Sequence, residues 1–82
     1  MTRNEFIWKI EHGDDIMFDV AGRHYTIVTW PDEGIRIVEQ NTNSDGTIYP
    51  SADELIEEFT VDNTPLAELC EQIVITSYTF VQ

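Results

Sequence analysis

A run of alternating residues around a two-residue turn constrains the fold of this chain more than any other feature. In residues 16–20, Ile, Phe and Val occupy every second position, which is the period of a half-buried β-strand. Ala21-Gly22 then forms a two-residue connection to a second such run over 23–30. Pairing the two runs across this turn places Phe18 opposite Tyr25 and Ile16 opposite Ile27 on one face. The sequence therefore predicts an antiparallel hairpin.

Three short helices are predicted from residues that cap helix ends. A capping box, in which a hydroxyl residue precedes a glutamate by three positions, occurs at Thr2–Glu5 and again at Ser51–Glu54. These boxes open predicted helices over 3–11, which Gly13 ends, and over 52–59. Thr64 as a cap and Pro65 at the first helical position predict a third helix through about Glu71.

The remaining segments complete an α+β fold. Residues 35–40 and 73–80 are β-rich, a short strand is predicted over 47–49, and turns are predicted at 31–34 and 43–46. With 82 residues the chain is expected to form a single domain over 1–82. We expect the order α-β-β-β-(β)-α-α-β, with a mainly antiparallel sheet of three to five strands covered on one face by the helices.

The charge of the chain is one-sided. The formal net charge is -12, and from Ile37 to Gln82 there are nine carboxylates and neither lysine nor arginine. Ordinary soluble surfaces mix both signs, because like charges four positions apart on a helix cost a few tenths of a kcal/mol each. A base-free half-chain therefore indicates either a surface with a charged partner or a solvated helix face that serves only solubility.

The predicted helix over 52–59 carries the densest part of this charge. Asp53 and Glu57, like Glu54 and Glu58, are four positions apart, so each pair is about 6 Å apart along the helix axis. This spacing resembles that of successive backbone phosphates, so the array could imitate nucleic acid in a basic groove. The predicted partner-binding acidic face consists of Asp53, Glu54, Glu57, Glu58 and Asp62, with Glu68 and Glu71 extending the field.

The same charge limits the classes of ligand and location. An acidic protein is repelled by nucleic acid and by anionic membrane surfaces, so we expect neither as a direct ligand. The expected partner is a basic protein surface, for example that of a nucleic-acid-binding protein. The apolar runs are far shorter than the roughly 20 residues that span a bilayer, and the first residues lack the apolar segment of a signal peptide, so a cytoplasmic protein is expected.

Catalytic chemistry has little support in the sequence. Cys70, His12 and His24 are far apart and belong to no local signature of a nucleophile or a metal site. Cys70, the only cysteine, is best interpreted as a small buried side chain. Carboxylate pairs are abundant, but nothing predicts a cleft that would shift their pKa values. We expect no enzymatic activity and no cofactor.

One segment resembles a calcium loop in its spacing. Asn41, Asn43, Asp45, Gly46 and Thr47 match the first half of an EF-hand loop in their spacing. The last position of such a loop requires a bidentate glutamate, and Ala52 stands there instead. A polar turn is therefore the preferred interpretation, and no metal is expected, although a calcium response remains an alternative.

Trp30 is the remaining candidate for an interface. Met17, Val28 and Trp30 lie on the second face of the predicted hairpin, so this face also needs cover, either from a helix or from another subunit. Aromatic side chains are frequent anchors of interfaces, although a small protein also uses tryptophan in its core. A homo-oligomer built through this face or through an exposed edge strand is therefore a second hypothesis.

Two segments resemble a broad group of proteins. The strings IMFDVAGRHYTIVTW and YPSADELIEEFTVDNTPLAELCEQI look like the small acidic proteins encoded by bacteria, their phages and mobile elements. DNA-mimicking inhibitors, including anti-CRISPR proteins, are among such proteins, and they share size and charge with this chain. The resemblance brings no activity and no functional residue with it.

The leading hypothesis is a non-enzymatic acidic protein that binds a basic protein surface, as a nucleic-acid mimic or inhibitor would. The alternative is a structural or self-associating domain that has no role as a mimic.

Overall fold

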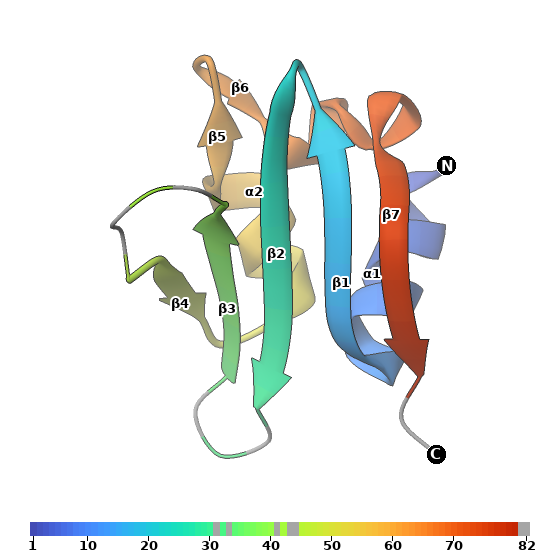
Figure 1. Cartoon of the computed structure of the whole chain (residues 1–82), viewed down its shortest axis with the longest axis vertical. Helices are drawn as coiled ribbons and strands as arrows, with labels where there is room; N and C mark the ends of the chain where they lie inside the picture. The colour runs from blue at the N-terminus through green and yellow to red at the C-terminus, as the bar shows by residue number, and fades with distance from the viewer. Residues whose placement is uncertain (31, 33, 41, 43–44, 81–82) are drawn as a thin grey trace.

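Five antiparallel strands form one sheet in the order β4-β3-β2-β1-β7, with β2 at its centre (Figure 1). The computed structural model describes residues 1–30, 32, 34–40, 42 and 45–80. The strands of this sheet are β1 (Gly13–Val20), β2 (Arg23–Trp30), β3 (Gly34–Glu39), β4 (Thr47–Tyr49) and β7 (Val74–Phe80). The last strand returns beside the first, so strands from both ends of the chain are paired.

The predicted hairpin is confirmed as β1 and β2. Phe18 lies opposite Tyr25 and Ile16 opposite Ile27, and all four side chains are buried. Ala21 and Gly22 both have positive φ angles, of 52° and 75°, which is the conformation of a type I′ turn. This turn matches the twist of the two strands and fixes which side chains point into the core.

Two helices cover one face of the sheet, as Figure 1 shows with α1 and α2 behind the strands. In α1 (Arg3–His12) the Thr2 hydroxyl accepts a hydrogen bond from the Glu5 amide, and in α2 (Ala52–Glu58) the Ser51 hydroxyl accepts one from the Glu54 amide. Both N-terminal caps and both helices are therefore confirmed. Gly13 ends α1 in an extended conformation, not a left-handed one, so α1 continues directly into β1.

The predicted third helix is wrong. Residues 60–65 instead form a second small hairpin of β5 (Thr60–Val61) and β6 (Thr64–Pro65), followed by two separate 3₁₀ turns, η1 (Leu66–Glu68) and η2 (Cys70–Gln72). Asp62 and Asn63 both adopt positive φ angles, which these residue types tolerate, and they close the hairpin. Thr64 is thereby taken into a strand, and η1 begins without a side-chain cap.

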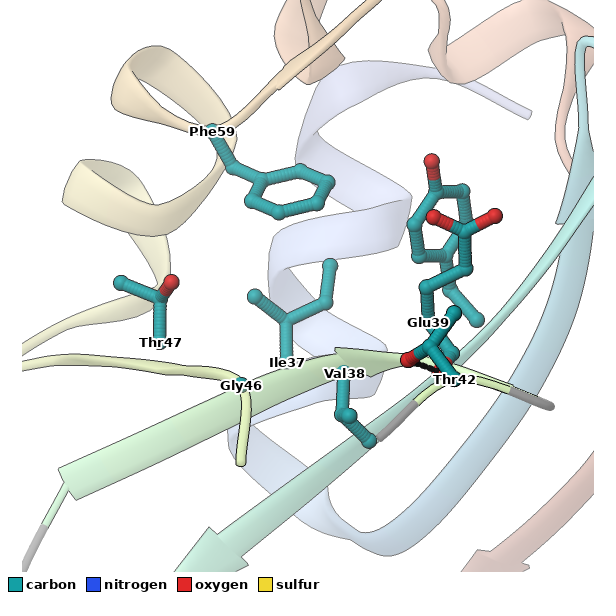
Figure 2. Close-up of a pocket in the computed structure, with 8 residues that line it drawn as sticks. Ile37, Val38, Glu39, Thr42, Gly46, Thr47 and Phe59 are labelled. Carbon is teal, nitrogen blue, oxygen red and sulfur yellow. Dashed lines mark hydrogen bonds between the residues drawn. The ribbon is translucent and has the colours of Figure 1, made fainter. Parts of the chain in front are cut away.

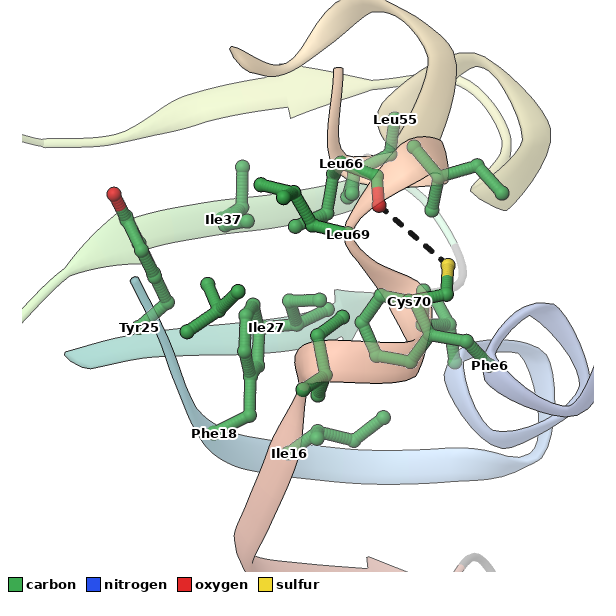
Figure 3. Packing of buried hydrophobic residues seen from close by; sticks show 14 of the residues in the cluster. Phe6, Ile16, Phe18, Tyr25, Ile27, Ile37, Leu55, Leu66, Leu69 and Cys70 are labelled. Atoms are coloured by element: carbon green, nitrogen blue, oxygen red, sulfur yellow. Dashed lines mark hydrogen bonds between the residues drawn. The ribbon is translucent and has the colours of Figure 1, made fainter. Parts of the chain in front are cut away.

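The core lies between the sheet and the helix layer (Figure 3). Strand residues Ile16, Phe18, Ile27 and Ile37 meet Phe6 of α1 and Leu55 of α2, each at most 1% exposed. Two hydrogen bonds also tie α1 to the sheet, from the Thr29 hydroxyl to the Ile10 carbonyl at 3.0 Å and from the Tyr78 hydroxyl to the Lys9 carbonyl at 3.0 Å. The predicted α+β architecture, with helices on one face, is confirmed.

The predicted turns are described only in part. Asp32, Gly34 and Gly46 are described, with φ angles of 105° at Gly34 and 81° at Gly46. Pro31 and Glu33 of the first turn, and Asn43 and Ser44 of the second, lie outside the described residues.

Candidate interaction surfaces

Helix α2 presents its carboxylates to solvent. Ala52, Leu55 and Ile56 are buried against the core, which leaves Asp53, Glu54, Glu57 and Glu58 exposed on the remaining faces of the helix. Because the buried residues and the Ser51 cap fix the helix, the backbone positions of these four residues are fixed as well. Their side chains are accessible to a partner.

One of these carboxylates already has a basic partner. Arg3, in the first turn of α1, forms an ion pair with Glu57, 54 positions later in the chain. Both side chains are about half exposed, so the pair remains screened by solvent. Glu57 therefore contributes less free negative charge than the sequence indicates.

Asp62 is compensated in the same way. The guanidinium of Arg23 on β2 lies 3.1 Å from the Asp62 carboxylate at the tip of the β5–β6 hairpin and 3.4 Å from that of Glu39 on β3. The negative charge of Asp62, and to a smaller extent that of Glu39, raises the pKa of Arg23 above its ordinary value. The half-chain that lacks basic residues is thus partly neutralised in space by arginines from the other half.

The remaining predicted acids are divided between two elements. Glu68 and Glu71 are exposed, but they lie on η1 and η2 instead of on one helix. Among the described residues, no basic side chain forms an ion pair with Asp53, Glu54, Glu58, Glu68 or Glu71. We call Asp53, Glu54 and Glu58 the acidic helix surface, since all three lie on α2 and none forms an ion pair with a described basic residue.

The side of the sheet that faces away from the helices has a different character. We call it the open sheet face, and it is the side toward the viewer in Figure 1. Met17, Trp30, Ile48 and Val74 project from it and are 41 to 61% exposed, while Val28 and Val38 on the same face are half-buried. Trp30 therefore lies at the surface, as the interface hypothesis required, and not in the core.

Arg36 is the basic residue of this face. Its guanidinium lies 4.9 Å from the centroid of the Trp30 ring, and Ile48 is its neighbour on β4. Within the described part of the chain, no carboxylate forms an ion pair with Arg36, and its Nε is buried without a hydrogen bond. The stacking on Trp30 was not predicted, although cross-strand neighbours of strand aromatics would have suggested it.

The histidines and the cysteine are separated. His12 Nδ1 donates to the Trp8 carbonyl at 2.9 Å and its ring stacks on Trp8, while His24 pairs with Asp19 on the open sheet face. Cys70 is buried, as predicted, and its Sγ donates to the Leu66 carbonyl at 3.5 Å (Figure 3). Burial raises the pKa of the Cys70 thiol, which disfavours the nucleophilic thiolate.

A hollow of about 190 Å³ lies between the ends of β3 and β4 and the residue that ends α2 (Figure 2). Phe59, Ile37 and Val38 line it together with polar groups, among them Glu39 and Thr42. The Glu39 carboxylate is engaged by Arg23, and the Thr42 hydroxyl donates to the Glu39 carbonyl at 2.7 Å. These two polar groups therefore take part in the local structure.

The described residues contain no group of three or more histidine, cysteine, aspartate or glutamate side chains able to hold a metal ion. Asn41 and Asn43 of the calcium-loop pattern lie outside the described residues, and Ala52, at the glutamate position, is buried.

None of the helices formed by the described residues has the length and apolar character needed to cross a membrane.

Comparison with known proteins gave no match: no family model, no curated protein and no solved structure corresponds to this chain.

Proposed function

We propose that this chain is a non-enzymatic interaction protein that uses its acidic helix surface to bind a basic surface on another protein. The observation that carries the proposal is that Asp53, Glu54 and Glu58 are exposed on one anchored helix and pair with no described basic residue. Fixed charges of one sign attract an oppositely charged partner over a Debye length and orient it during encounter.

The predicted acidic face becomes smaller in this proposal. Glu57 and Asp62 hold Arg3 and Arg23, so an incoming basic residue would have to compete with an arginine already in place. Glu54 and Glu58 are the residues to mutate first, because they are about 6 Å apart along α2 and no described basic residue forms an ion pair with either.

A nucleic-acid-binding protein is the partner class that fits this spacing best. Carboxylates about 6 Å apart along a helix axis approximate the separation of neighbouring phosphates on one strand. A protein that occupies a nucleic-acid-binding groove in this way excludes the nucleic acid and acts as an inhibitor. The proposal therefore includes competition with DNA or RNA for the partner.

The experiment compares proteins retained from a bacterial lysate by three immobilised chains at low and at moderate salt. The chains are the wild type, the variant Glu54→Lys/Glu58→Lys, and the control Asp32→Lys/Asp45→Lys, which changes the net charge equally at two exposed acids outside α2. We expect a basic protein on the wild type and the control, weaker retention at moderate salt, and none on the α2 variant.

Release of the retained protein by added duplex DNA would support the mimic role. Circular dichroism melting of all three chains establishes that each is folded. Equal retention by the α2 variant and the control would mean that net charge alone is responsible. Absence of any basic partner at low salt would reduce the acidic helix surface to a solvated helix face.

A further inference from the structure

The open sheet face holds most of the exposed apolar surface of the described residues. The described residues include five large apolar side chains that are at least 41% exposed. Four of them lie on this face: Met17, Trp30, Ile48 and Val74. The fifth, Trp8, lies on α1 and stacks on His12. Exposed apolar side chains gathered on one face of an antiparallel sheet are typical of a surface that another layer covers.

This face also carries little of the charge of the molecule. Its described strand positions hold Asp15, Asp19 and Arg36, together with His24, which pairs with Asp19. The formal charge of the whole chain is -12, so most of the excess lies elsewhere, on the helix side and in the turns. Two copies of the chain therefore repel each other least when they approach through their open sheet faces.

The charges on this face are arranged so that the face is complementary to itself. Arg36, Val28 and Asp15 form one row across three neighbouring strands, because Val28 pairs with Arg36 of β3 on one side and with Asp15 of β1 on the other. The positive and the negative residue are thus equally far from the central strand, each by one strand spacing of about 4.8 Å.

We propose that two copies of this chain pack through their open sheet faces about a two-fold axis parallel to β2. This axis exchanges the positions of β1 and β3, so Arg36 of each copy faces Asp15 of the other. The same operation places Val38 over Met17 of the second copy and brings the two Trp30 side chains together at the axis. In an isologous dimer of this type each contact away from the axis occurs twice.

The alternative two-fold axis in the plane of the face, perpendicular to the strands, gives the opposite result. It places β3 over β3, and where the axis crosses the strands at the row of Arg36 and Asp15, Arg36 meets Arg36 and Asp15 meets Asp15. No position of this axis brings Arg36 onto Asp15, so the charge pattern favours the axis parallel to β2.

The area is compatible with a reversible dimer. The five strands contain 8, 8, 6, 3 and 7 residues, 32 in total, and with a rise of about 3.3 Å per residue and a spacing of about 4.8 Å they present about 500 Å² per copy. Specific interfaces bury about 800 Å² per partner, so this dimer is at the small end of the range. The dimer leaves both helix layers outside, and it therefore neither needs nor blocks the acidic helix surface.

A charge exchange tests the proposal. Sedimentation at several protein concentrations is compared for the wild type, Asp15→Arg, Arg36→Asp, the double variant Asp15→Arg/Arg36→Asp, and the control Asp45→Arg. We expect a concentration-dependent dimer for the wild type, at least tenfold weaker for either single variant, and restored in the double variant. Asp15→Arg is the most informative variant. It lowers the net negative charge by as much as the control Asp45→Arg does, yet we expect it to weaken the dimer and the control to leave the dimer unchanged.

A second measurement does not depend on how the charge variants fold. In Trp8→Phe the remaining tryptophan is Trp30, which is 42% exposed in the single chain, so dimer dissociation on dilution should shift its emission to longer wavelength. A wild type that stays monomeric at all concentrations overturns the proposal. A dimer whose Trp30 emission does not change on dilution, or which both single variants leave intact, overturns it as well by placing the contact elsewhere, for instance along the β7 edge.

Discussion

The guanidinium of Arg3 pairs with the carboxylate of Glu57 and so joins the start of α1 to α2. Both helices pack on the same face of the sheet, and each is capped by its own hydroxyl residue. The pair lies at the surface of the helix layer, where it reduces the charge of α2. Its energetic contribution can be separated from that of the core.

We expect the Arg3–Glu57 coupling to be small. A double-mutant cycle of Arg3→Ala and Glu57→Ala, followed by urea unfolding, should give a coupling free energy of about 0.2 to 1 kcal/mol, because both side chains are about half exposed. The coupling should vanish at high salt. The matched cycle of Arg3→Ala with Glu54→Ala should give no coupling, and a value like that of the first cycle would show a general charge effect.

Salt should stabilise the protein. Screening reduces the repulsion among carboxylates in a chain of net charge -12, so the melting temperature should rise between low and moderate NaCl. Arg23→Gln removes one positive charge, which takes the net charge from -12 to -13, and also removes two ion pairs. This variant should therefore show a steeper rise, measured by circular dichroism. A flat or falling wild-type response would mean that the ion pairs already compensate the acids.

Two glycines with similar backbone conformations should differ in their tolerance of alanine. The φ angle is 75° at Gly22 and 81° at Gly46, so alanine is strained at either position by about 1 to 2 kcal/mol. At Gly22 an added Cβ meets nothing within 4 Å, whereas at Gly46 it would lie 2.5 Å from the Ile37 carbonyl oxygen. Gly46→Ala should therefore reduce the free energy of unfolding distinctly more than Gly22→Ala in urea. Equal losses would indicate that the β3–β4 connection moves to admit the methyl group.

Alkaline pH should destabilise the fold. Burial raises the pKa of the Cys70 thiol and of the hydroxyls of Tyr25, Tyr49 and Tyr78, so each ionises more readily in the unfolded chain. Stability from these groups is complete below their unfolded pKa values and is lost as pH rises from about 9 through the folded values. Urea unfolding between about pH 7 and 11 measures this loss. Cys70→Ala should remove the earliest part, and a free energy of unfolding that stays constant up to pH 11 would contradict the prediction.

The parts of the fold that depend on neighbouring residues were predictable from the sequence. The pairing of Phe18 with Tyr25 follows from the length of the Ala21-Gly22 turn, and the caps at Thr2 and Ser51 follow from local hydrogen bonds. The turn at Asp62 and Asn63 was missed, because Thr64 and Pro65 form a convincing helix start when they are considered alone. The available signal was the Asp62-Asn63 pair itself, because both residue types tolerate the left-handed conformation.

The candidate surfaces depend on long-range contacts, and these were less predictable. The exposure of the α2 carboxylates was predictable, but no sequence pattern assigns Arg3 to Glu57 or Arg23 to Asp62, since each pair joins distant segments. The open sheet face was foreseen in part through Met17, Val28 and Trp30. The contributions of Ile48 and Val74 became apparent only with the strand order, which places β4 and β7 at the two edges.

The separation of apolar sheet and acidic helices gives the molecule the polarity of a surfactant. One side has a tendency to leave water and the other has a strong tendency to stay in it, and the two are held back to back by a rigid core. At concentrations at which the chain is a monomer, it should therefore adsorb to an air–water boundary or an alkyl-coated resin through the open sheet face, with α2 toward the water. The orientation would be set by the protein itself, without any tag or linker.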